Sequence, residues 1–135
     1  MTKAEKEIAV AHELQRAQEA FAACSLLVDG GFLADAVSRL YYSLLYRVKA
    51  LLLTEGLEPK SHEGALPLLS MHFVNRARLD PGDSQLFARL MKYREEADYS
   101  PSIVFTAGDL KRFRDEVGAL SEKIFDLIRA AGFPA

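Results

Sequence analysis

The chain has 135 residues, half of them hydrophobic and 27% charged, which excludes a largely disordered protein and predicts one domain over residues 1–135. The formal net charge of −2 disfavours a protein that coats long nucleic acid, but it leaves room for a local basic cleft. Cys24 is the single cysteine, which excludes an intramolecular disulfide. The charged N-terminus lacks an apolar signal core and no segment is apolar enough to cross a bilayer, so we expect a cytoplasmic protein without membrane association.

Two long helices are predicted in the first half of the chain. The first runs from about Thr2 to Val28, because apolar residues recur there with the period of a helix. We expect these residues to face the core: Ile8, Ala11, Leu14 or Gln15, Ala17, Phe21, Cys24 and Leu27 or Val28. The second helix runs from about Phe32 to Glu55 and is apolar on every side, which is typical of the central helix of a bundle.

A third helix is predicted to begin near His62, because Ser61 before it is a suitable N-cap. Pro67 interrupts this prediction, since a proline inside a helix removes one backbone hydrogen bond. The helix therefore either begins later or bends between Glu63 and Pro67. It ends before Asp80-Pro81-Gly82, a strong turn signal.

Two further helices complete the predicted fold. The fourth begins at Asp83 or Ser84 and ends near Asp98, before Pro101. The fifth begins after Thr106-Ala107-Gly108-Asp109, which resembles a capping box. Short connections between the helices predict an all-α, up-and-down bundle of four to five antiparallel helices. The apolar surface of the second helix also favours a homodimer.

Polar and aromatic residues at helical spacing stand out in two otherwise apolar segments. Residues three, four or seven apart share one face of a helix. The first set is Arg39, Tyr42 and Tyr46, and the second set is Arg94, Asp98 and Tyr99. If the two sets face each other, they form a site with two guanidinium groups, several phenols and one carboxylate. Such a site suits a phosphate and a base ring better than a hydrolytic water.

A structural role for the same residues stays open. Arg39 could pair with Asp35 one turn earlier, and Arg94 could pair with Asp98 on its own helix. The tyrosines could be ordinary core or interface aromatics. His62 lies at a helix start, where free backbone N–H groups attract an anion, but it could equally be a solvated loop residue.

Other kinds of site have little support. No two histidines have the spacing of a zinc-binding helix, and no Glu-x-x-His pattern occurs. No nucleophile elbow and no glycine-rich phosphate loop occur either. We therefore expect neither a metal site nor a cofactor.

Three short motifs in order resemble the HEPN domain family over roughly residues 5–130. They are Ala36-Val37-Ser38-Arg39-Leu40-Tyr41-Tyr42, Ser61-His62 after a loop with glycine and proline, and Arg94-x-x-Ala97-Asp98-Tyr99. The resemblance implies an all-α bundle, usually dimeric, that binds nucleotide or RNA. It also implies a minimal nucleotidyltransferase as partner in a toxin–antitoxin or defence pair. Many family members are metal-independent ribonucleases with an Arg-x4-6-His motif. This chain lacks that motif, because Tyr99 stands at position +5 from Arg94.

Three functions follow as hypotheses. The leading one is a binding module that takes nucleotide or RNA through Arg39, Tyr42, Arg94 and Tyr99, supported by Tyr46, His62 and Asp98. In a variant of it, the partner transferase modifies Tyr99. The second is a divergent ribonuclease that uses Arg94, Asp98 and Tyr99. The third is a purely structural dimeric interaction protein, in which the arginines only join helices.

Overall fold

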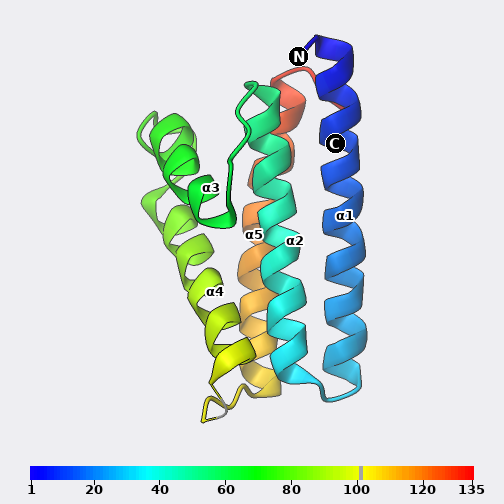
Figure 1. Ribbon diagram of the computed structural model, residues 1–135, viewed down its shortest axis with the longest axis vertical. Coiled ribbons are helices and arrows are strands. Elements are labelled where there is room, and N and C mark those ends of the chain that lie inside the picture. Colours follow the sequence, from blue (N-terminus) through cyan, green and yellow to red (C-terminus); the bar gives the residue numbers. More distant parts are fainter. Residues whose placement is uncertain (101) are drawn as a thin grey trace.

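The computed structural model describes residues 1–100 and 102–135, and these residues form an all-α bundle, as the sequence predicts (Figure 1). Pro101, used above as the signal that ends the fourth helix, lies outside the described residues. The described residues contain no β-strand. They form α1 (Lys3–Asp29), α2 (Leu33–Thr54), α3 (His62–Leu69), the short π-helical turn η1 (Ser70–Val74), α4 (Pro81–Tyr99) and α5 (Ala107–Ala130).

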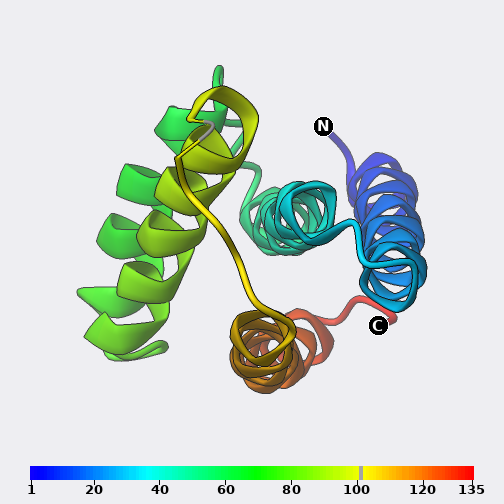
Figure 2. The same ribbon diagram turned by 90° about the horizontal axis from the view of Figure 1, so that it is seen from below.

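Helix α2 lies in the centre of the bundle, between α1 on one side and α4 on the other, with α5 along a third side (Figure 2). Most of its residues are buried, among them Leu40, Leu44 and Leu51. The long helices alternate in direction, since α1 and α4 descend while α2 and α5 ascend in Figure 1. The predicted central helix and the up-and-down order are therefore confirmed.

The predicted buried face of α1 is confirmed in the second half of the helix, where Ala17 and Cys24 are fully buried and Phe21 packs against the core, but it is wrong near the N-terminus. Ile8 is 72% exposed and Ala11 is exposed as well, although both were expected to face the core. The buried residues of α1 are Val10, Glu13, Ala17, Ala20 and Cys24. The error has a physical reason: α1 packs mainly against α2, so only a narrow stripe is covered. Because the first half of that stripe contains the charged Glu13, apolar periodicity did not reveal that half.

Helix α3 begins at His62, and its N-cap is the predicted Ser61, whose Oγ accepts a hydrogen bond from the Gly64 amide at 3.0 Å. Pro67 lies inside the helix, so the alternative of a later start is wrong. The missing N–H of Pro67 leaves the Glu63 carbonyl without its helical partner. Both residues are exposed, so water can bond this carbonyl and the proline is tolerated. The backbone changes to π-helical geometry only at Ser70.

Side-chain caps hold the starts of α4 and α5. Helix α4 begins at Pro81, two or three residues before the predicted start at Asp83 or Ser84, because Asp80 and Asp83 form a capping box. The predicted capping box of α5 is confirmed: the Asp109 amide donates to Thr106 Oγ1 at 3.1 Å, and the Thr106 amide donates to Asp109 Oδ2 at 2.9 Å. No helix in the described part of the chain combines the length and apolarity that a membrane span requires.

Candidate functional site

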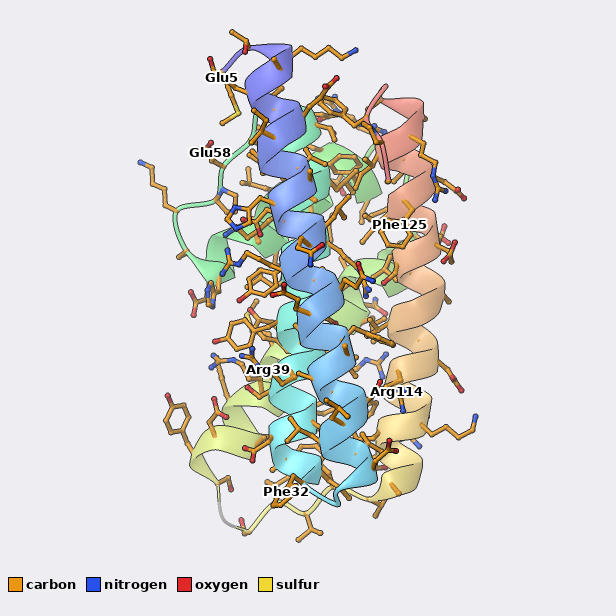
Figure 3. All side chains as sticks on the ribbon, turned by 90° about the vertical axis from the view of Figure 1, so that its right-hand side faces the viewer. Glu5, Phe32, Arg39, Glu58, Arg114 and Phe125 are labelled. Carbon is orange, nitrogen blue, oxygen red and sulfur yellow. The ribbon has the colours of Figure 1, made fainter. Side chains whose placement is uncertain are left out.

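Arg39, Tyr42 and Tyr46 lie along one edge of α2, as their spacing predicts. Each is half-buried, whereas the residues between them are buried in the core. The Arg39 guanidinium carbon is 4.9 Å from the centroid of the Tyr42 ring, and the Tyr42 and Tyr46 ring centroids are 6.0 Å apart. Figure 3 shows Arg39 on the side of α2 that lies away from α5. Within the described residues Arg39 forms no ion pair, so the pair with Asp35 is absent.

Arg94 reaches the same place from α4. Its guanidinium carbon is 5.4 Å from the Tyr41 ring centroid and 5.8 Å from the Tyr42 ring centroid. Arg94 Nη1 donates to Asp98 Oδ2 at 3.1 Å, one turn further along α4. The Arg94 side chain is only 16% exposed, and its Nε has no hydrogen-bond partner among the described residues. The two predicted sets of residues thus meet at Tyr42, and we call Arg39, Tyr41, Tyr42 and Arg94 the Arg–Tyr cluster.

His62 joins this cluster from the first turn of α3. Its ring packs edge to face against Tyr42, with 5.5 Å between the centroids, and its centroid is 6.4 Å from that of Tyr41. His62 is nevertheless exposed, so one side of the imidazole faces solvent. A residue far from Arg94 in sequence therefore lies against the same two tyrosine rings as Arg94.

Tyr41 is a member of the cluster that sequence analysis considered only as an ordinary aromatic. It is fully buried, stacks on Phe87 with 6.1 Å between the centroids, and its Oη has no hydrogen-bond partner among the described residues. Burial raises the pKa of Tyr41 to about 12, although the nearby positive charge of Arg94 acts in the opposite direction. Tyr41 therefore stays protonated well above neutral pH, and it packs against Tyr42 and Arg94 from the core side of the cluster.

Arg16 on α1 is a second residue that sequence analysis missed. Its guanidinium carbon is 4.1 Å from the Tyr46 ring centroid. Arg16, Arg39 and Tyr46 together line a shallow pocket of about 300 Å³ between α1 and α2. Sequence analysis gave no reason to single out Arg16, because its contact with Tyr46 depends on how α1 packs against α2.

Tyr99 is not brought into the cluster. It is the last residue of α4, and 80% of its surface is exposed. Asp98 beside it is also exposed, and it contacts the cluster only through its ion pair with Arg94. Six of the seven predicted residues therefore lie together, while Tyr99 points to solvent at the edge.

The chemistry of the cluster favours anion and ring recognition. Asp98 offsets part of the charge of Arg94, whereas the guanidinium of Arg39 keeps its charge available to a phosphate or carboxylate. The phenol rings supply flat apolar surfaces against which a base or a guanidinium can stack. No group of three histidine, cysteine, aspartate or glutamate side chains in the described part of the chain is arranged to hold a metal ion.

Comparison with known proteins identifies the family. The HEPN domain model matches residues 10–128, which is most of the chain. A UPF0332 protein from Thermotoga maritima is 31% identical over 130 residues, covering 93% of this chain and 98% of that protein. The chain therefore belongs to the HEPN domain family, as the three motifs and their order predicted.

Two archaeal relatives carry more descriptive names. “Putative toxin MJ0142” from Methanocaldococcus jannaschii is 37% identical over 90 residues, which are 67% of this chain and 61% of that protein. “Putative toxin MJ0605” from the same organism is 32% identical over 87 residues, which are 64% of this chain and 65% of that protein. Both matches thus leave more than a third of each relative without a counterpart here.

Proposed function

We propose that this HEPN-family protein is a nucleotide- or RNA-binding module, and that the Arg–Tyr cluster is its binding site. One observation carries the proposal: two guanidinium groups from different helices, Arg39 and Arg94, lie against the ring of Tyr42, and only Arg94 is paired with a carboxylate. A phosphate on Arg39 would receive charge-assisted hydrogen bonds from a side chain already held by its ring contact. Tyr46 and His62 extend the same surface.

The names of the relatives support a wider setting for this module. Two relatives carry the name “Putative toxin”, and the resemblance to the family implies that such proteins act in pairs. We propose a homodimer that works with a minimal nucleotidyltransferase in a toxin–antitoxin or defence-type pair. Co-purification with a coexpressed minimal nucleotidyltransferase tests that partner. Light scattering of the chain alone tests the homodimer.

Substitution of the arginines tests the binding site. We expect Arg94→Ala and Arg39→Ala each to weaken binding of labelled RNA or nucleotide about tenfold or more, measured by fluorescence anisotropy. Arg112→Ala is the matched control, because it removes the same charge from an exposed pair with Asp109 on α5. If Arg94→Ala lowers the melting temperature but leaves every ligand response unchanged, the cluster is structural and the proposal fails.

A metal-independent ribonuclease is the second candidate, and the position of His62 favours it. The chain lacks the histidine of the family motif, yet His62 lies against the same tyrosine rings as Arg94. In such a reaction the RNA 2′-oxygen attacks the adjacent phosphorus and the bond to the 5′-oxygen breaks. The products are a 2′,3′-cyclic phosphate and a 5′-hydroxyl. In this candidate reaction we infer that His62 takes the 2′-hydroxyl proton or protonates the leaving oxygen, and that Arg94 stabilises the charge on the phosphorane.

Incubation with a labelled RNA pool in chelator distinguishes the two candidates. The ribonuclease requires cleavage by the wild type that both Arg94→Ala and His62→Ala abolish. His72→Ala serves as the control, since His72 lies in the π-helical turn and shares no ring contact with the cluster. Binding without cleavage leaves the module as first proposed, and cleavage that survives His62→Ala contradicts the histidine's role.

A further inference from the structure

The outer face of α1 carries two large aliphatic side chains that are exposed to solvent. Ile8 is 72% exposed and Leu26 is 74% exposed. They are 18 residues apart in the chain, about five helical turns, so they lie in line on one side of the helix and about 27 Å from each other. Figure 3 views the molecule from this side, with α1 in front of the other helices. The apolar residues of α2, by contrast, are mostly buried within the bundle.

The outer face between these two residues carries little charge. Ala11, Gln15 and Ala22 are exposed and uncharged. Glu19 lies at the edge of the face, where its Oε1 accepts a hydrogen bond from Gln15 Nε2 at 3.1 Å. The outward face of a surface helix normally carries charged side chains, so an uncharged face with exposed aliphatic residues indicates a contact surface for protein.

A hollow of about 450 Å³ lies at the N-terminal end of this face. Its lining consists of Ala4, Glu7, Ile8, Ala11 and Pro134. Only Glu7 among these residues is charged. The face therefore has an apolar hollow at one end and the exposed side chain of Leu26 at the other, and a matching surface must have the two features in the reverse order.

A second copy of this chain has that reverse order when its α1 runs antiparallel to the first. A twofold axis midway between Ile8 and Leu26 places Leu26 of the second copy against Ile8 and over the hollow. The same contact then forms at the other end of the pair. A parallel pair would instead place the two hollows against each other and leave both without a side chain to fill them.

The charges on one flank of the face match in the antiparallel pair. The twofold axis brings each flank of α1 against the same flank of the other copy, so Glu7 comes beside Ser25 of the second copy. Ser25 Oγ accepts a hydrogen bond from Arg114 Nη2 of α5 at 2.9 Å. Among the described residues, Glu7 has no cation and Arg114 no carboxylate within 4.0 Å. Each copy therefore offers a free carboxylate beside a guanidinium of the other.

The other flank holds one unfavourable contact. In this register the two Glu19 carboxylates come within about 6 Å of each other along the helix axis. Each also comes level with Gln15 of the opposite copy, whose amide has a second N–H to donate. The repulsion is thus partly offset, and removal of the charge at Glu19 should strengthen the pair.

We propose that two copies of this chain associate through the outer face of α1, in antiparallel order, with Leu26 of each copy in the hollow beside Ile8 of the other. The inference rests on the homodimer proposed above and assigns its surface. The face is about 27 Å long and one helix wide, which is small for a protein interface, so we expect the dimer to exchange with monomer at micromolar concentration. The Arg–Tyr cluster lies on the side of α2 towards α3 and α4, so the pair leaves it open to ligand.

Charged substitutions at the two ends test the face. Ile8→Asp and Leu26→Asp should each raise the dimer Kd about a hundredfold or more in sedimentation equilibrium, because symmetry places each charge in two apolar contacts. Both side chains are exposed, so the melting temperature should stay near that of the wild type. Met71→Asp is the matched control, since Met71 is 56% exposed but lies on η1, and it should leave the Kd unchanged.

Glu19→Gln tests the register in the opposite direction. It should lower the dimer Kd about threefold, because it removes the repulsion between the two carboxylates and keeps a group that can hydrogen-bond. A higher Kd in this variant would contradict the register.

Cysteine cross-linking tests the antiparallel order. Ala11 and Ala22 are exposed, and in the proposed pair each lies within about one residue of the level of the other. A mixture of Ala11→Cys and a longer, tagged Ala22→Cys should form a mixed disulfide dimer on oxidation with diamide, whereas neither variant alone should cross-link. Cys24 is fully buried and present in all samples. A parallel pair would cross-link each variant with itself and overturn the proposal.

The outcomes separate this inference from the proposed function. A wild type that stays monomeric up to about 200 µM would remove both the homodimer and its surface. A dimer whose Kd is the same in Ile8→Asp, Leu26→Asp and the wild type would keep the homodimer and overturn this face. Arg94→Ala should leave the dimer Kd unchanged, so its effect on RNA or nucleotide binding tests the binding site alone.

Discussion

Guanidinium groups lie against aromatic rings in two regions of the molecule, on different sides of α2. Towards α4, the rings belong to the tyrosines of the Arg–Tyr cluster. Towards α1 and α5, Arg47 lies 5.3 Å from the Phe21 ring centroid and 5.7 Å from that of Phe125, and Arg114 lies 5.7 Å from Phe21. Figure 3 shows Phe125 and Arg114 between α1 and α5. We call Phe21, Arg47, Arg114 and Phe125 the Arg–Phe column.

The two regions differ in access to solvent. Arg47 is only 9% exposed, donates to Ser121 Oγ at 3.0 Å, and has no carboxylate within 4.0 Å in the described part of the chain. Burial lowers the pKa of Arg47, and the negative charge of Glu122 partly opposes this. In the Arg–Tyr cluster, by contrast, Arg39 and Tyr42 are only half-buried. An arginine on an aromatic ring therefore marks a candidate site only where a ligand can reach the guanidinium.

The largest expected effect on stability is at Arg47 in the Arg–Phe column, where two substitutions distinguish the contribution of packing from that of charge. Arg47→Ala should lower the free energy of unfolding by about 2–4 kcal/mol, because it empties the space between two phenyl rings. Arg47→Met fills most of that space without a buried charge. Its free energy of unfolding should therefore stay within about 1.5 kcal/mol of the wild-type value. Urea unfolding followed by circular dichroism measures both. A loss in Arg47→Met as large as that in Arg47→Ala would mean that the charge itself is needed.

The next effect concerns alkaline pH and the buried side of the Arg–Tyr cluster. The pKa of Tyr41 is raised from 10.0 to about 12 in the folded protein, so the folded state holds this proton more tightly than the unfolded chain. The ionisation of Tyr41 therefore leaves the free energy of unfolding unchanged below pH 10 and lowers it as the pH rises from 10 to 12. The contribution of Tyr41 to this fall is at most about 1.4 kcal/mol per pH unit.

Comparison of the wild type with Tyr41→Phe isolates that contribution, because every other residue is the same in both proteins. The wild type should lose stability more steeply over this range. At pH 7, Tyr41→Phe should be neutral or slightly stabilising, since it removes a buried hydroxyl without a partner. Equal slopes for the two proteins above pH 10 would contradict the raised pKa.

A smaller stability effect is expected for Arg94 than for Arg47. Arg94→Ala should lower the free energy of unfolding by only about 1 kcal/mol, because the ion pair with Asp98 is partly exposed and the ring contacts are individually weak. Thermal unfolding measures this loss alongside the binding assay described above. A loss as large as that of Arg47→Ala would make the Arg–Tyr cluster a structural counterpart of the Arg–Phe column.

The smallest stability effect is expected at Tyr99, which lies beyond both regions. Tyr99→Phe should change the free energy of unfolding by less than about 0.5 kcal/mol, because the side chain is 80% exposed. It should still abolish any mass increase that appears after coexpression with a minimal nucleotidyltransferase. An unchanged intact mass of the wild type would remove Tyr99 as an acceptor, and a mass increase that persists in Tyr99→Phe would place the modification elsewhere.

Local patterns in the sequence predicted most of the fold. The N-cap at Ser61, the capping box at Thr106 and the largely apolar α2 each depend on residues that lie close together in the chain. The N-terminal half of the buried face of α1 could not be predicted in the same way. It depends on the rotation of α1 about its own axis relative to α2. Alanines occur on several sides of α1, so its faces are similar in hydrophobicity.

The sequence by itself determined the all-α class, the central helix and the spacing that puts Arg39, Tyr42 and Tyr46 on one edge, because helix formation and helical period are local properties. Only the tertiary structure decided that Arg94 and His62 meet at Tyr42 and that Tyr99 does not. It also decided that Glu13 is buried with one oxygen lacking a donor. These facts depend on the packing of α1, α3 and α4 around α2, and contacts between distant segments have no signature in residue spacing.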